Sequence, residues 1–325
     1  MFDHFDLVDE EGRPLRQPSE ASIALIEGFR KTALPTFAVM DGALFSDLPK
    51  SLEERKISSR SLFLDHPDAE IARAAALFIP IENETTLTKL LSVPKAENAV
   101  VFWSSSAGED KLFRHLRGIN VILIPDDESI LNEENDTELS PLVPRDQSVL
   151  FRHYDPNVIE ATLPLLTTEQ FVRLMGPCDQ IMWFSLEKGA RRRALRPEND
   201  VVVPRGPLRL TDEQIEELEF NRKASAQSRR VNYLRVVEPD RTRLMSDTEL
   251  YRFSATEVSN GESLGLRSER SLTLWVYLQL HSDGKIGRDP GLRGYLQSFP
   301  EDGTPDDKIY LLMTRLSALP ASTKL

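Results

Sequence analysis

Two residues of the sequence, Cys178 and His153, could form a thiol nucleophile and its base. A cysteine attacks as its thiolate, which a neighbouring imidazole can generate. Cys178, however, follows Gly176 and Pro177 at the expected end of a helix, where no local pattern marks a nucleophile. A free cysteine in such a place is more often a small buried residue than a reactive one, so we expect Cys178 to be inert.

Three consecutive serines, Ser104–Ser106, could hold a nucleophile at Ser104 or bind an anion at a helix N-terminus. Serine is also a preferred helix cap, because its side-chain oxygen accepts a hydrogen bond from an unpaired N–H group of the first turn. We therefore expect the serines to cap a helix that runs through Lys111–Arg117 and stops at Gly118.

The arginine run Arg191–Arg193 could bind phosphate. On an acidic chain, however, such a run is more often a solvated loop or a surface patch that binds an acidic partner. The glycine-rich nucleotide loops, Gly-x-Ser-x-Gly and His-Glu-x-x-His do not occur. A single cysteine cannot build a structural zinc site. The histidines show no metal-ligand spacing either: His4, His66, His115, His153 and His281. The sequence therefore predicts no enzyme, no cofactor and no metal.

Composition narrows the choice of partner and compartment. The 325 residues carry a formal net charge of -12, which disfavours phosphate backbones and anionic lipid, so we expect no nucleic-acid or membrane partner. Met1–Glu11 is acidic and lacks the basic start and apolar stretch of a signal peptide. No apolar segment is long enough to span a bilayer. We expect a cytoplasmic protein.

Short apolar runs bounded by turn residues predict the strands of a first domain. They are Thr36–Met40, Ala76–Ile81, Asn98–Trp103, Val121–Ile124, Val149–Tyr154 and Asp179–Phe184. Helical spacing and capping residues predict helices between them, at Ser19–Lys31, Glu84–Leu91, Lys111–Arg117 and from Thr167 to Gly176. This alternation indicates an α/β domain over residues 1–186, interrupted by an acidic loop at Pro125–Arg145.

The pattern becomes helical after a polar segment at residues 187–209, which we interpret as a linker. Thr211 and Gln214 form a capping box that opens a long helix to about Val236. Ser268–His281 is apolar nearly all round, which favours a buried helix and leaves a strand as the alternative. Thr304 and Pro305 begin another helix. Residues 210–325 are thus predicted to form a smaller, all-helical lobe.

Several short motifs follow one another along the chain, and their order says more about the family of the protein than any single motif does. They are Phe37–Leu44, Ala75–Ile81, Val101–Ser106, His115–Arg117 and Val149–Ile159, followed by Gln170 and Phe171–Pro177. This order resembles the type VI secretion effector-adaptor (effector chaperone) family, formerly a domain of unknown function. Its members carry an aliphatic-Asp-Gly-Ala turn, Trp-x-x-Ser, His-Leu-Arg, Phe-Arg-x-Tyr-Asp-Pro and a Gln-x-x-x-x-x-Gly-Pro helix. The resemblance covers Thr36–Phe184, and the helical lobe matches it in layout only.

The resemblance implies that its motif residues shape the fold and do not catalyse. They are Asp41, Gly42, Trp103, His115, Arg117, Arg152, Tyr154, Asp155 and Pro156. From the residues themselves, Arg152 and Asp155 are expected to form an ion pair or a turn cap, and Asp41 to serve the turn at Gly42. The sequence departs from the family at Asn157, where arginine is usual, and in the acidic loop at residues 125–145.

The function that the resemblance implies is that of an adaptor. Such a protein binds the N-terminal region of a secreted toxin effector and the tip of the VgrG spike protein. It loads the effector onto the spike and is not itself secreted. We expect the lobe at residues 210–325 to supply effector specificity, because it matches the family least. Two alternatives stay open: a small hydrolase using Ser104 or Cys178, and an immunity protein that neutralises a toxin by binding it.

Overall fold

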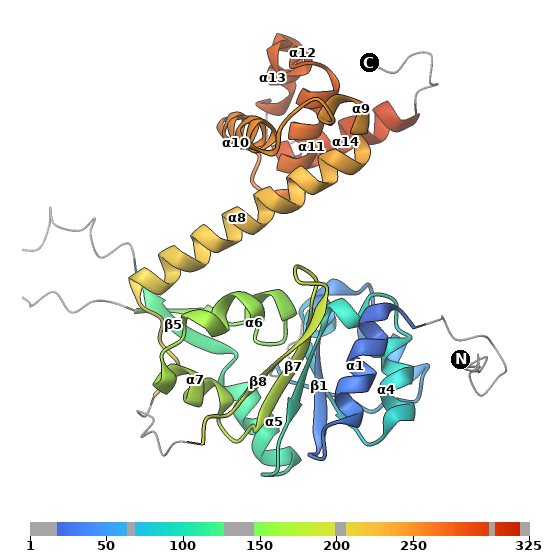
Figure 1. Cartoon of the computed structure of the whole chain (residues 1–325), viewed down its shortest axis with the longest axis vertical. Coiled ribbons are helices and arrows are strands. Elements are labelled where there is room, and N and C mark those ends of the chain that lie inside the picture. Colours follow the sequence, from blue (N-terminus) through green and yellow to red (C-terminus); the bar gives the residue numbers. More distant parts are fainter. Residues whose placement is uncertain (1–17, 64–68, 127–145, 199–205, 299–302, 319–325) are drawn as a thin grey trace, which may run out of the picture. The chain divides into compact units, whose positions relative to one another are not determined.

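The computed structural model describes residues 18–63, 69–126, 146–198, 206–298 and 303–318. The chain divides into two compact units, Met1–Leu218 and Glu219–Leu325 (Figure 1). The first unit contains a sheet with helices, and the second is helical in its described residues, so the predicted α/β domain followed by a helical lobe is confirmed. The division falls inside one helix, α8 (Asp212–Val237).

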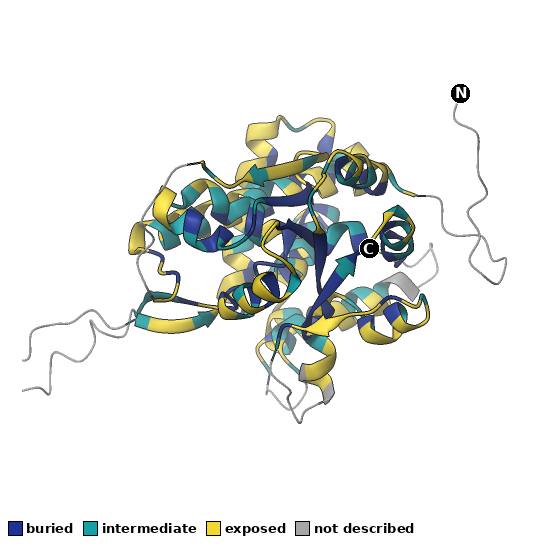
Figure 2. Ribbon diagram, turned by 90° about the horizontal axis from the view of Figure 1, so that it is seen from below, coloured by how far each residue is buried: buried dark blue, intermediate teal, exposed yellow. Residues whose placement is uncertain are grey.

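The first unit is built on a six-stranded sheet with the order β2-β3-β1-β4-β7-β8, in which every neighbouring pair is antiparallel. The strands are β1 (Thr36–Asp41), β2 (Arg60–Ser61), β3 (Ala76–Ile81), β4 (Val100–Ser104), β7 (Gln180–Ser185) and β8 (Ala190–Leu195). Every residue of β1, β4 and β7 is buried, because helices cover both faces of the sheet. Figure 2 shows the buried residues gathered in these strands.

The helices form one layer on each face of the sheet (Figure 1). One layer holds α1 (Glu20–Arg30), α2 (Leu48–Glu53) and α4 (Glu84–Leu91), and the other holds α5 (Glu109–Gly118), α6 (Pro156–Thr162) and α7 (Thr168–Met175). Successive side chains of a strand point to opposite faces. In β1, Phe37 and Val39 therefore join the core under α5 and α7, whereas Ala38 and Met40 join the core under α1 and α4. The described residues of the unit also form short helices at η1 (Gly42–Leu44), α3 (Ala69–Ala74), η2 (Ala96–Asn98) and η4 (Leu163–Leu165).

A separate antiparallel hairpin is formed by β5 (Val121–Pro125) and β6 (Asp146–Leu150). The sequence placed the later strand at Val149–Tyr154, which is wrong for Phe151–Tyr154. After Leu150 the chain turns, with the His153 N–H bonded to the Phe151 carbonyl at 2.8 Å and the Asp155 N–H to the Arg152 carbonyl at 2.9 Å. Most of the acidic loop predicted at residues 125–145 lies outside the described residues.

The three serines do not cap α5, contrary to the sequence-based expectation. The N-cap is Gly108, whose φ of +92° suits glycine, and its position has no side-chain cap. The hydroxyl of Ser104 is bonded to that of Thr36 at 2.9 Å, and that of Ser105 donates to the Pro177 carbonyl at 2.6 Å. The Ser106 N–H donates to Asp179 at 2.6 Å. The serines therefore join the end of β4 to its neighbours.

The segment interpreted as a linker, residues 187–209, contains a strand of the first unit. Its residues 190–195 form β8, which pairs with β7 over six positions. Leu208, near its end, is buried in the core beneath α5 and α7. The arginines of β8 replace the apolar alternation that marks a strand in the sequence, because an edge strand tolerates charged side chains that a central strand would bury.

In the second unit other helices pack around α11 (Glu269–His281), which confirms the helical interpretation of that segment. Leu272, Trp275 and Leu278 of α11 are buried against α14 (Pro305–Ala318), and Val276 lies against α8 and α10 (Asp247–Ser263). The other helices among its described residues are α9 (Pro239–Thr242), α12 (Lys285–Arg288) and α13 (Pro290–Leu296). Among the described residues of both units, no helix combines the length and apolar character needed to cross a membrane.

Candidate functional site

Asp41, Arg152 and Asp155 meet in one charged cluster, although more than a hundred residues separate the first from the others. The Arg152 guanidinium donates to Asp41 Oδ2 from Nε at 3.1 Å and also from Nη2. The same Nη2 lies 3.3 Å from Asp155 Oδ2. The Asp41 side chain is 1% exposed and that of Arg152 is 38% exposed. The arginine therefore brings the end of β1 to the start of α6 and neutralises a buried carboxylate.

Asp41 has a second task at the turn after β1. Its Oδ1 accepts the Ala43 N–H at 3.0 Å and so caps the short helix η1. The next residue, Gly42, lies against the backbone that leads into β3: a Cβ at this position would stand 2.4 Å from the Ala75 carbonyl oxygen. No side chain fits there, which explains why the motif requires glycine after the aspartate.

Helix α6 begins with Asp155 as its N-cap and Pro156 in its first turn. Asp155 Oδ1 accepts the Asn157 N–H at 2.9 Å, and Pro156 occupies the first turn, where its missing N–H costs nothing. The Asn157 side-chain amide also donates to Asp155 Oδ1, at 3.2 Å. The departure at Asn157 thus leaves the cap intact.

The charged cluster lies beside buried aromatic groups. Burial opposes the charge of the Arg152 guanidinium, but its hydrogen bond to Asp41 and the charges of Asp41 and Asp155 raise its pKa above the ordinary value. Burial, followed by the charge of Asp41, raises the pKa of the Tyr154 phenol well above 10. Arginine and tyrosine are therefore fixed as cation and neutral phenol, and neither is poised to exchange a proton near neutral pH.

His153 is fully buried next to this cluster and holds the turn after β6. Asn120 donates from Nδ2 to the Leu62 carbonyl at 2.9 Å, which orients its Oδ1 to accept the His153 Nε2–H at 2.9 Å. The imidazole also contacts the Trp103 ring edge to face, with centroids 5.6 Å apart. Burial lowers the pKa of His153 to about 3, so the ring is neutral. Trp103, from β4, thereby joins the motif residues through His153.

His115 and Arg117 do not join this cluster. His115, on α5, donates from Nε2 to the Leu174 carbonyl at 2.8 Å, and its ring fills the space that a Cβ at Gly176 would take. The His-Leu-Arg and Gly-Pro segments of the resemblance are thus packed against each other. Burial, aided by the charges of Arg173 and Arg196, lowers the pKa of His115. Arg117 is half-buried and forms no ion pair with a described residue.

A hollow of about 550 Å³ lies over His115, with Arg114, Arg173 and Arg196 in its wall. No local pattern in the sequence predicted it, because its residues come from four separate segments. Arg173 belongs to the last turn of α7, where a cation offsets the unpaired carbonyl groups of a helix end. Arg114, on α5, donates from Nε to the Asp110 carbonyl of the same helix at 3.1 Å. The helices that carry them therefore account for Arg114 and Arg173, whereas Arg196 follows β8.

Cys178 is buried and hydrogen-bonded as a thiol. It donates towards the carbonyl groups of Ser104, at 3.2 Å, and Gln180, at 3.0 Å. Burial raises the pKa of Cys178 to about 12, which leaves the thiolate scarce at neutral pH. Within the part of the chain that the structure describes, no three His, Cys, Asp or Glu side chains converge as metal ligands.

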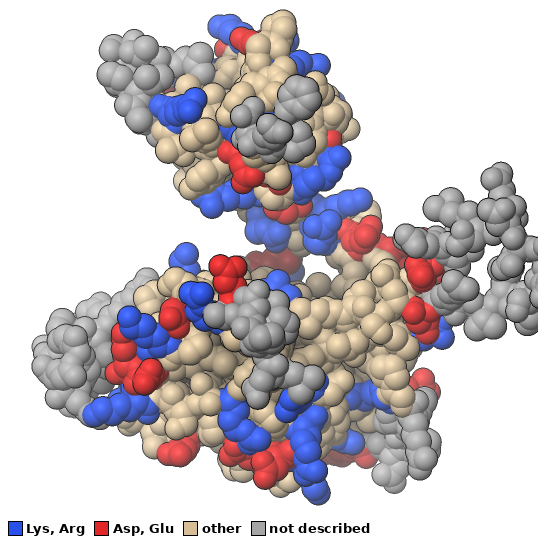
Figure 3. Space-filling model, turned by 180° about the vertical axis from the view of Figure 1, so that it is seen from behind, with Lys and Arg blue, Asp and Glu red and all other residues tan. Residues whose placement is uncertain are grey.

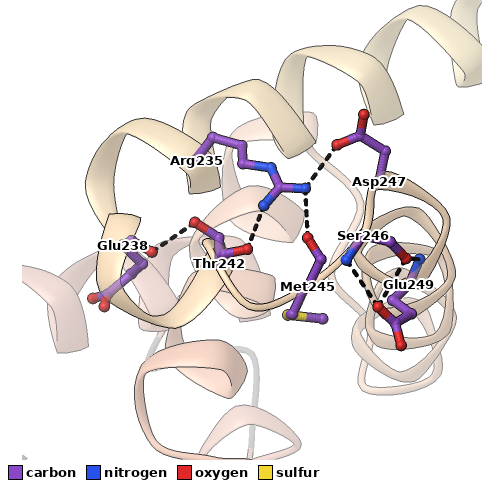
Figure 4. Close-up of polar contacts among 7 residues, drawn as sticks. All are labelled: Arg235, Glu238, Thr242, Met245, Ser246, Asp247 and Glu249. Atoms are coloured by element: carbon purple, nitrogen blue, oxygen red, sulfur yellow. Dashed lines mark hydrogen bonds and ion pairs between the residues drawn. The ribbon is translucent and has the colours of Figure 1, made fainter.

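In the second unit, Arg235 holds the corner that joins α8 to α10 (Figure 4). Its guanidinium donates to the Thr242 carbonyl, to the Met245 carbonyl at 2.9 Å and to Asp247 Oδ1 at 2.7 Å. Ser246 and Glu249 then form a capping box at the start of α10. This frame presents two apolar side chains to solvent, Val236 at 78% and Leu244 at 84% exposure.

The surface of the molecule carries charges of both signs. On the face that Figure 3 shows, Lys and Arg side chains are interspersed with Asp and Glu, and a wide uncharged area lies on the first unit.

Comparison with known proteins adds one finding. Residues 36–132 match a family described as "Domain of unknown function (DUF4123)". The matched stretch contains Asp41, Gly42, Trp103, His115 and Arg117, whereas Arg152 and Asp155 lie beyond it. No curated protein and no solved structure matches the chain.

Proposed function

We propose that the protein is a non-enzymatic, cytoplasmic adaptor that binds a type VI secretion effector and loads it onto the VgrG spike. The observation that carries the proposal is the order of the motif segments, four of which lie within the matched residues 36–132. In the structure, Asp41, Arg152 and Asp155 hold together distant parts of the chain, as the resemblance implies for such motif residues.

The state of the candidate catalytic groups supports a binding role. A hydrolase would need Ser104 or Cys178 beside an available base. The Ser104 hydroxyl is instead bonded to Thr36, and the Cys178 thiol to backbone carbonyls. His153, the base considered with Cys178, is held neutral against Asn120.

We assign effector recognition to the second unit and propose the corner at Val236 and Leu244 as its contact. Both side chains are exposed, and the frame around Arg235 fixes the backbone between them. Exposed apolar anchors on a rigid frame favour binding, because little conformational entropy is lost when they are buried.

The test is co-purification from a host with an active type VI system, using the full-length tagged chain. We expect the natural chain to recover a toxin and a spike protein. The double variant Val236→Asp, Leu244→Asp should lose the toxin and keep the spike. Leu186→Asp, which changes another exposed leucine on the first unit, should keep both and serves as the matched control.

The outcomes separate the candidate functions. Recovery of neither partner by a folded chain would reject the adaptor function. Recovery of a toxin without a spike protein would favour an immunity protein. If exchanging the second unit between two adaptors leaves cargo choice with the first unit, the assignment of specificity to the second unit is wrong.

A further inference from the structure

Strand β8 is the last strand of the sheet and, among the residues that the structure describes, pairs only with β7. In an antiparallel pair, residues alternate between those whose peptide groups bond the neighbouring strand and those whose peptide groups point away. The Arg196 N–H donates to the Asp179 carbonyl at 2.9 Å, which places Arg196 in the first set. With the register of β7 and β8, Ala194, Arg192 and Ala190 also face β7.

The peptide groups of Arg191, Arg193 and Leu195 therefore point away from the sheet. No backbone or side-chain hydrogen bond joins these outward groups to any described residue. They form a row of donors and acceptors with the spacing that a further antiparallel strand would match. Leu195, at 52% exposure, lies at one end of the row.

The side chains of β8 determine which strand could pair with it. Arg192 lies 3.7 Å from Glu160, and the Arg191 guanidinium packs over Gly28 of α1. Arg193 is exposed and forms no ion pair with a described residue. Positive charges along an open edge oppose pairing with apolar or basic strands, whereas acidic side chains on an added strand would face them favourably.

We propose that the open edge of β8 binds an extended, acidic segment of a partner polypeptide as a seventh strand of the sheet. The peptide groups of Arg191, Arg193 and Leu195 supply the main-chain hydrogen bonds, and the arginine side chains select for carboxylates. That the partner is a protein rests on the proposed adaptor function. The capacity of the β8 edge to pair with an added strand does not depend on that function.

The test uses the full chain and short labelled peptides of alternating valine and glutamate. Binding is followed by fluorescence anisotropy, and the amides by hydrogen exchange with NMR detection. We expect the amides of Arg191, Arg193 and Leu195 to exchange more slowly with the peptide bound, while those of Arg192 and Ala194, already bonded to β7, change little. A valine–lysine peptide should not bind.

Two variants separate charge from backbone pairing. Arg193→Glu should weaken binding about tenfold, because it turns an attraction into a repulsion. Leu195→Pro removes an outward N–H that makes no bond in the sheet, so it should weaken binding while the fold is kept. Arg222→Glu, an exposed arginine of α8, makes the same change of charge elsewhere and should bind as the natural chain does.

Three results would overturn the proposal. One is peptide binding that leaves the amides of Arg191, Arg193 and Leu195 unchanged. The second is equal binding by the lysine peptide. The third is self-association in sedimentation that Arg193→Glu abolishes, without peptide binding, which would identify a second copy as the occupant. Since the peptide test needs neither toxin nor spike, its failure leaves the adaptor proposal standing, and the reverse also holds.

Discussion

At the scale of single residues, Arg152 connects two carboxylates from distant parts of the chain. It pairs with Asp41 at the end of β1 and with Asp155 at the start of α6. Removing the arginine would leave the Asp41 carboxylate buried without its charged partner, and an uncompensated buried charge is far more costly than the loss of an exposed ion pair.

We predict that Arg152→Ala lowers the free energy of unfolding by about 2–3 kcal/mol, less than for a fully buried pair because water reaches part of the guanidinium. Urea denaturation monitored by tryptophan fluorescence measures the change. Arg192→Ala, which breaks the looser contact with Glu160, should alter stability by no more than about 0.5 kcal/mol. Equal effects of the two substitutions would contradict the importance of the Asp41 pair.

His153 makes stability depend on pH. Its pKa in the folded protein is about 3, below the ordinary 6.5, so the unfolded chain takes up a proton first as the pH falls. Between pH 6.5 and 3, His153 alone therefore lowers the free energy of unfolding by about 1.4 kcal/mol for each pH unit of acidification. His153→Asn keeps a polar partner for Asn120 but cannot titrate, so its stability should fall less steeply. The free energy of unfolding is measured by urea titration at pH 7 and at pH 5. An equal loss between these pH values in the natural chain and in His153→Asn would rule this out.

The sequence predicts what the motif residues do better than it predicts which residues they contact. A turn-capping role for Asp41 and an ion pair or cap at Arg152 and Asp155 follow from residue types next to turn signals, and the structure contains them. The pairing of Asp41 with Arg152 spans 111 positions, and no local pattern encodes such a contact. The same limit applies to His153 and Asn120, 33 positions apart.

At the scale of elements, the beginnings of α7 and α8 are joined by their capping boxes. Each has threonine followed three residues later by glutamine: Thr167 with Gln170, and Thr211 with Gln214. The two glutamine amides also bond each other reciprocally, at 2.9 and 2.7 Å. Each glutamine side chain thus caps its own helix and also bonds the side chain that caps the other helix.

We predict that Gln214→Ala lowers the free energy of unfolding by about 1–2 kcal/mol, because the Leu165 carbonyl and the Gln170 amide both lose a partner. A double-mutant cycle with Gln170→Ala measures the coupling, which should exceed about 0.5 kcal/mol. Gln227→Ala, which removes an exposed hydrogen bond in α8, is the control and should have a smaller effect. Additive effects of the two substitutions would show that the amides do not cooperate.

The elements that the sequence predicted well are those with a strong local signal. Both capping boxes and the apolar runs of β1, β3 and β7 belong to this group. The wrong cap at Ser104–Ser106 arose because serine and glycine both suit a helix start, and the backbone conformation at Gly108 decides between them. Strand β8 was missed because its arginines lack a strand pattern.

At the scale of the whole molecule, each unit has its own hydrophobic core. Ile79 lies in the core of the first unit and Ile309 in that of the second, and both are fully buried. The change in composition after residue 186 predicted the two-part organisation, whereas the antiparallel strand order depends on contacts far apart in the sequence.

We predict that Ile309→Val and Ile79→Val each lower stability by about 1 kcal/mol, and only in the unit that carries the substitution. Native-state hydrogen exchange resolves the two units, since each substitution should speed the exchange of slow amides in its own unit. If either substitution accelerates exchange equally in both units, they unfold as one cooperative structure and the prediction fails.

The protected state of Cys178 makes the natural sequence convenient for site-specific labelling. The chain has one cysteine, it is buried, and its pKa of about 12 leaves little thiolate for a maleimide to capture. A cysteine introduced at an exposed position such as Leu244 or Arg193 would therefore take up a dye selectively, without prior removal of the native thiol. Pairs of such dyes would report by energy transfer how the distance between the two units responds when a partner binds.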